Sequence, residues 1–191
     1  GGSSVVEFMT IEPTDRDYLR GIVLFGQNVA SYKFALAKSI VELATQGREA
    51  VPLTDLAEPF SRHVCEHLQQ APRQSTSRSS KYLDACRAFN EGRIPKEELL
   101  GATARLGFVN VIDAFHVVGS DEVPVRFFED RRRDALRGIV LTPALHGLAE
   151  VTADNALAEV EARWRLVETA WELGVSSTLV AYDGGSGQIV A

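Results

Sequence analysis

The sequence predicts an α+β fold, with a mainly helical domain of about six or seven helices and a small antiparallel sheet. Most of the chain places apolar residues at the 3.6-residue spacing of amphipathic helices. Residues 114–142 instead carry β-branched and aromatic residues with a shorter period, which is typical of strands. The composition, 45% hydrophobic and 24% charged over 191 residues, suits a globular domain that buries its own core.

Two helices are expected near the start. Residues 17–27 are mostly apolar around the whole helix and can be capped by Thr14 or Asp15, so we expect this helix to be central. Residues 28–44 form the second helix, which ends before Gly47, a favourable residue for a helix C-terminus.

The helix 28–44 has an apolar face opposite a polar stripe made of Ser31, Lys38, Glu42 and Thr45. Lys33 interrupts the apolar face. Because an unpaired buried charge is costly, Lys33 must reach solvent, pair with a carboxylate or bind an anionic ligand such as a phosphate.

The middle of the chain predicts three more helices. One covers 54–70 with Thr54 as its cap, the second covers 81–92 and ends at Gly92, and the third covers 95–108. The segment 71–80 is polar, serine-rich and without periodicity, so it is predicted to be a loop.

The strand-like region is predicted to form two or three antiparallel strands, at 114–119, 123–130 and 136–142. Residues 119–122 can form the turn between the first two. A short helix begins at Pro143 and a long one covers 153–173. The long helix has Trp164 and Trp171 on its core face, and its exposed stripe is expected to hold Glu161, Arg165, Glu168 and Glu172.

Residues 1–8 resemble a cloning remnant, so native sequence is expected to begin near Met9. Residues 9–174 are predicted to form a single domain. Residues 175–191 read as a tail or hairpin that leads to a further domain.

The net charge of −6 argues against nucleic-acid binding over the whole surface, but it allows a local basic patch. Cys65 and Cys86 lack metal-site spacing and are expected to be reduced core residues. No segment is long enough to span a membrane, and no signal peptide is visible. We therefore expect a cytoplasmic protein without a metal or cofactor.

No standard catalytic motif is present. His63 and His67 have the i,i+4 spacing that can bind a metal, but we expect both to be exposed to solvent. His116 is expected at the core edge on a strand. A stand-alone enzyme would need spatial clustering of residues such as Lys33, His116, Glu12 and Asp113.

Two arginine-rich clusters are the better candidates for a functional site. The first runs from Arg73 to Arg93, and the second is Arg131, Arg132 and Arg133. Guanidinium and hydroxyl groups suit phosphate contacts, and we expect the arginines to gather on one face. The predicted phosphate contacts are Lys33, Arg73, Arg78, Lys81, Arg131, Arg132 and Arg133. The predicted contacts to bases or modified bases are Gln27, Asn28 and Tyr32.

The segments NVASYKFALAK and EARWRLVETAW, in the order found here, resemble the N-terminal region of bacterial proteins that carry an HNH endonuclease domain at their C-terminus. The resemblance covers most of the chain, from about Thr10 to Asp183. It implies a role in restriction or antiphage defence, with cleavage performed by a separate domain.

Two interpretations remain open. The first is a noncatalytic domain that recognises or positions DNA. The second is a protein-interaction or dimerisation module, since aromatic side chains on a helix can anchor an interface. We prefer the first, because two basic clusters on an otherwise acidic chain indicate a polarised surface.

Overall fold

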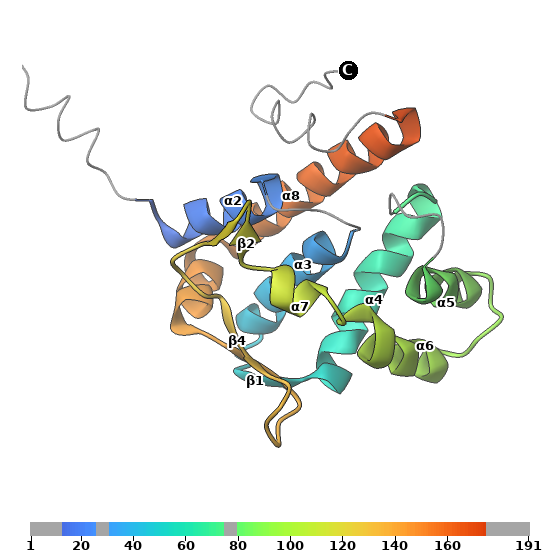
Figure 1. The fold of residues 1–191 in the computed structure, drawn as a ribbon, viewed down its shortest axis with the longest axis horizontal. Coiled ribbons are helices and arrows are strands. Elements are labelled where there is room, and N and C mark those ends of the chain that lie inside the picture. Colours follow the sequence, from blue (N-terminus) through green and yellow to red (C-terminus); the bar gives the residue numbers. More distant parts are fainter. Residues whose placement is uncertain (1–12, 26–30, 75–79, 175–191) are drawn as a thin grey trace, which may run out of the picture.

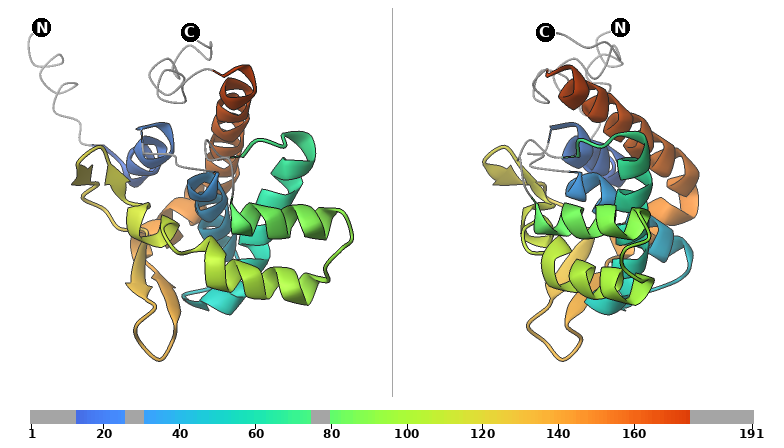
Figure 2. Two further views of the ribbon diagram at one scale, coloured as in Figure 1. Left: turned by 45° about the vertical axis from the view of Figure 1, so that its right-hand side comes forward. Right: turned by 90° about the vertical axis from the view of Figure 1, so that its right-hand side faces the viewer.

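The computed structural model describes residues 13–25, 31–74 and 80–174. Over these residues the chain forms seven α-helices, a π-helical turn, a three-stranded antiparallel sheet and a separate two-stranded hairpin. Helices make up most of the body and the three-stranded sheet lies at one end (Figures 1 and 2). The predicted α+β class is therefore confirmed.

The central helix is α3 (Tyr32–Thr45), in which ten of fourteen residues are buried. It packs against α8 and α4, and more weakly against α2 (Asp15–Phe25). The prediction that the first helix is central was wrong. The expected polar stripe of α3 was also partly wrong, because Ser31 is fully buried beneath neighbouring elements.

The helices of the middle region follow the predicted order. They are α4 (Leu53–Gln70), α5 (Lys81–Asn90) and α6 (Lys96–Ala102), which continues into a π-helical turn at Thr103–Gly107. Thr54 lies inside α4 rather than at its cap, which is Pro52. A short helix, α7 (Val111–Ala114), was not predicted.

The three-stranded sheet has the order β1-β5-β4, with β5 (Gly138–Leu141) between β1 (Ala50–Pro52) and β4 (Phe128–Arg131). Strand β1 was not predicted. A Cβ atom on Gly138 would lie 2.0 Å from the Val51 carbonyl oxygen, so only glycine fits at this position.

The predicted turn at 119–122 does form a hairpin, but a smaller one than expected. It joins β2 (Val117–Val118) to β3 (Asp121–Glu122), and Val117 pairs with Glu122. The next predicted strand pairs instead with β5, so the chain forms two separate β units.

The last helix, α8 (Pro143–Leu173), contains one non-helical residue, Thr152, at φ −136° and ψ 22°. This kink divides it close to where the sequence predicted two helices. Trp164 and Trp171 are buried, which confirms the predicted core face. Cys65 and Cys86 are buried free thiols. Within the described ranges, no helix is long and apolar enough to cross a bilayer.

Candidate functional site

The second arginine cluster lies at the end of β4 and on the loop that joins β4 to β5. This hairpin projects from the body of the molecule (Figures 1 and 2). Arg137 lies at its return end, has a φ of 50°, and accepts a 3.0 Å hydrogen bond at its carbonyl oxygen from the backbone N–H of Leu53. The hairpin base is thereby fixed to the start of α4.

Two of the hairpin arginines form salt bridges with acidic neighbours. Arg132 contacts Asp130 and Asp113, each at 2.7 Å, and Arg131 contacts Asp134 at 3.2 Å. The hydrogen bond from Arg132 lowers the pKa of the Asp130 carboxyl.

Two further arginines of the hairpin are not engaged in this way. Arg133 and Arg137 are exposed, and neither forms a salt bridge with another residue of the described part of the chain. Their guanidinium groups are therefore accessible to an anion.

The first arginine cluster lies elsewhere. Arg73 follows the end of α4 and donates to the Trp171 carbonyl oxygen at 3.2 Å, and Lys81 is exposed at the start of α5. Arg78 lies outside the described residues. Since the hairpin is fixed at the other end of α4, whose 18 residues span about 27 Å, the two clusters lie at opposite ends of this helix.

Lys33 is 3% exposed, and its ammonium group donates to the Val117 carbonyl oxygen at 3.0 Å. Its side chain is buried, and no carboxylate in residues 13–25, 31–74 or 80–174 forms a salt bridge with it. Burial lowers the pKa of Lys33 from its ordinary value of 10.5 to about 8. The predicted phosphate contact at Lys33 stays a prediction, since this buried ammonium group donates to a backbone carbonyl oxygen.

The three predicted base contacts lie close to Lys33 in the sequence. The hydroxyl of Tyr32 lies 2.9 Å from the Ser80 hydroxyl, and burial raises its pKa. This contact joins α3 to the start of α5. Gln27 and Asn28 lie outside the described residues, so their predicted roles remain open.

The clustering that an enzyme would need is incomplete among the described residues. His116 is 1% exposed, lies just before β2 and accepts a 2.9 Å hydrogen bond from the Phe127 N–H. Burial lowers the pKa of His116 to about 3, assisted by the charges of Arg126 and Lys33. Asp113 faces Arg132 instead, and Glu12 is outside the described residues.

His63 and His67 are both buried, so the expectation that they face solvent was wrong. His63 lies 2.7 Å from Glu42. Burial alone would raise the pKa of Glu42, but its contacts with His63 and Arg62 hold it at about 2. Nowhere in the described ranges do three or more histidine, cysteine or acidic side chains form a metal-binding group.

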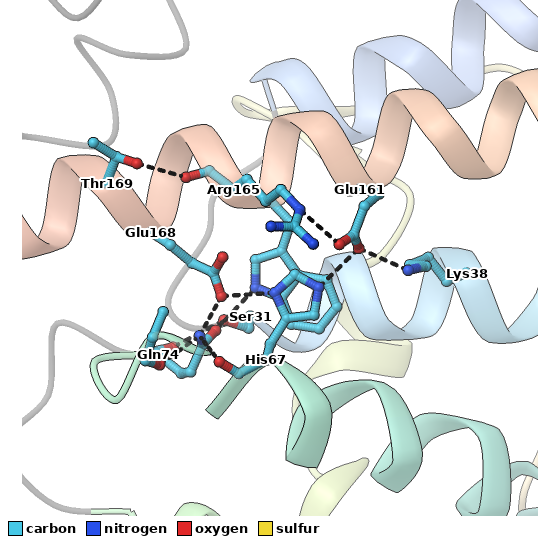
Figure 3. A network of polar contacts seen from close by, with 10 residues as sticks. Ser31, Lys38, His67, Gln74, Glu161, Arg165, Glu168 and Thr169 are labelled. Carbon is cyan, nitrogen blue, oxygen red and sulfur yellow. Dashed lines mark hydrogen bonds and ion pairs between the residues drawn. The ribbon is translucent and has the colours of Figure 1, made fainter. Parts of the chain in front are cut away.

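His67 joins three helices through a buried polar network (Figure 3). Its Nδ1 lies 2.7 Å from Glu168 and its Nε2 lies 2.8 Å from Glu161. The imidazole ring stacks on Trp164, with ring centres 3.5 Å apart. We call His67, Glu161, Glu168, Lys38, Gln74, Ser31 and Trp164 the His67 network.

The remaining members attach the network to α3 and to the segment after α4. Lys38 contacts Glu161 at 2.7 Å. Gln74 donates to Glu168 and accepts from both Ser31 and the Trp164 indole N–H, the latter at 2.9 Å. Glu168, 7% exposed, was expected on the exposed stripe of α8. Its position beside Trp164 and Trp171 in the helical repeat was the available sequence signal.

Comparisons with known proteins add no assignment. The chain matches no protein-family model, no curated protein and no solved structure.

Proposed function

We propose that this chain is a noncatalytic domain that recognises or positions DNA, and that the β4–β5 hairpin is its contact element. The observation that carries the proposal is the pair of exposed guanidinium groups, Arg133 and Arg137, on a hairpin that projects from the body. Guanidinium groups donate to phosphate oxygens in a planar, bidentate geometry. A projecting two-stranded ribbon also has dimensions that the major groove admits.

The resemblance to HNH endonuclease proteins supports the same proposal. It would assign strand cleavage to a separate domain, acting on DNA in the cytoplasm of a bacterium as part of restriction or antiphage defence. The residues described here would then supply target contact and orientation.

The test is fluorescence anisotropy of a labelled duplex over a range of salt concentrations. The double variant Arg133→Gln/Arg137→Gln should bind more weakly. Since each phosphate contact contributes about 0.9 to the logarithmic salt dependence, the slope should become shallower by about 2. The matched control is Lys96→Gln/Arg105→Gln, which removes the same charge from two exposed residues outside the hairpin and outside the first arginine cluster.

If both double variants lost the same DNA affinity, the effect would come from net charge alone, and the hairpin would be excluded as the contact element. The triple variant Arg131→Gln/Arg132→Gln/Arg133→Gln tests the original cluster in the same assay. Unchanged binding in that variant would exclude the cluster.

The second candidate function is protein interaction or homodimerisation. It is favoured by the net charge of −6 and by the ion pairs that already engage Arg131 and Arg132. A hairpin of mixed charge also suits a charged protein partner. Light scattering that shows a dimer, together with no DNA affinity at low salt, would favour this candidate over the first.

A further inference from the structure

The chemistry of the His67 network begins with its hydrogen-bond donors. A carboxylate only accepts hydrogen bonds, so each ring nitrogen of His67 that faces one must carry a proton. Burial alone would raise the pKa of Glu161, but its hydrogen bonds from Lys38 and His67 hold it at about 2. Glu161 is therefore ionised near neutral pH and fixes a proton on Nε2 of His67.

The second contact of His67 then needs another proton. Nδ1 lies 2.7 Å from Glu168 Oε2, and two lone pairs at that distance would repel. A proton between them, on either atom, makes the contact favourable. The contact therefore exists only while the pair holds this additional proton.

The Glu168 carboxyl group also determines the position of Gln74. Gln74 donates to Glu168 and to the Ala71 carbonyl oxygen, and its own carbonyl oxygen accepts from Ser31 and Trp164. The backbone of Gln74 accepts from the Ser31 N–H at 3.1 Å. One amide side chain thus connects α3, α8 and the segment that follows α4.

We propose that the proton between His67 and Glu168 keeps Gln74 attached to α3 and α8, and that its loss at higher pH releases this attachment. After the proton leaves, Glu168 is a buried carboxylate whose remaining described partner is the Gln74 amide. A buried charge without a charged partner is strongly unfavourable, so Glu168 must move and Gln74 must move with it.

Charged groups from each packed element act on this proton. Lys38 of α3 and Arg165 of α8 are cationic and contact Glu161, whereas Glu161 and Glu168 of α8 are anionic. On α4 itself, His63 contacts Glu42 rather than this network. The cations oppose the additional proton, whereas the ionised carboxylate of Glu161 favours it.

The two tryptophans of the chain provide a built-in measurement. The Trp164 indole N–H donates to Gln74, whereas the buried Trp171 indole N–H has no hydrogen-bond partner among the described residues. A pH titration of ¹⁵N-labelled protein would follow the His67 ring nitrogens and both indole groups. We expect the Trp164 signal to shift with the same midpoint as His67, while the Trp171 signal does not.

Hydrogen exchange gives a second readout. Above that midpoint, exchange of the Trp164 indole relative to Trp171 should rise by about tenfold, the factor for one buried hydrogen bond. Taking the ratio removes the general acceleration of exchange by base. The proposal would be overturned if the His67 ring kept one charge state over the whole pH range in which the protein is folded. It would also be overturned if the Trp164 indole signal did not change when His67 changes its charge state.

Variants separate this role from simple packing. His67→Gln and Glu168→Gln should each abolish the pH response of Trp164. His63→Gln, which changes a buried histidine one turn earlier on the same helix, should preserve it. If the His67 and Glu168 variants do not fold, the titration of the unmodified protein still decides the outcome.

Discussion

Lys33→Met tests whether burial of the charged Lys33 amine destabilises the folded protein. Methionine keeps most of the side-chain length and removes the charge. The folded-state pKa of Lys33 is about 8, against an ordinary value of 10.5. This difference corresponds to about 3 kcal/mol of unfavourable free energy when both the folded and the unfolded amine are charged.

The sign of the pH dependence follows from proton counting. Between pH 8 and pH 10.5, the unfolded chain binds more protons at Lys33 than the folded chain, so stability rises with pH in this window. From pH 8 to pH 10, the unmodified protein should gain about 2 kcal/mol of unfolding free energy relative to Lys33→Met. At a single pH the difference is less informative, because the variant also leaves the Val117 carbonyl oxygen without its donor.

The measurement is urea denaturation followed by tryptophan fluorescence at several pH values. Lys81→Met, at an exposed lysine, is the matched control and should show no such trend. Parallel pH profiles for Lys33→Met and the unmodified protein would refute the argument. A loss of DNA affinity in Lys33→Met without a change in stability would instead support the phosphate contact predicted from sequence.

Four further substitutions test the fold. Gly138→Ala should lower the melting temperature sharply, with a cost of about 3 kcal/mol, because its Cβ would collide with the Val51 carbonyl oxygen. Gly147→Ala, a helical position with open space around it, should be stabilising in the same assay. Glu42→Gln should lower the free energy of unfolding by about 2 kcal/mol at pH 7. This loss should become smaller as the pH drops through 4.5 towards 2, because ionised Glu42 stabilises the fold only above that range. Urea denaturation at pH 7 and at pH 3 measures the difference. Thr142→Ala removes the cap of α8 and should cost about 1 kcal/mol by chemical denaturation.

Local chemistry explains which parts of the fold could be predicted. Gly47, Gly92 and Gly174 all have φ between 74° and 77°, and each follows a helix as the sequence indicated. Strand β1 could not be found in the same way. Ala50–Pro52 is only three residues long, and its partner β5 lies far along the chain, so no local pattern marks it.

The candidate sites were harder to predict because burial of polar groups depends on tertiary partners. His67 and Glu168 were expected to face solvent, but both are buried and lie 2.7 Å from each other, so that each supplies a polar partner for the other. Lys33 was recognised as anomalous from the apolar face around it. Its partner, the Val117 carbonyl oxygen, is a backbone atom and leaves no signature in the sequence.

The positions of the arginine clusters also decide how DNA could approach. A separation of about 27 Å along α4 is less than one turn of a duplex. One duplex could therefore contact both clusters only by lying along this helix. That path passes Asp55 and Glu66, which are exposed, and Glu58, which is partly exposed. Asp55 forms a salt bridge with Arg48 and Glu58 forms one with Arg62, so Glu66 is the carboxylate on this path that opposes a phosphate most directly. The projecting hairpin also carries exposed carboxylates, but Arg133 and Arg137 on it are exposed and form no salt bridge with the described residues. This is why we propose the hairpin, rather than a continuous basic face, as the contact element.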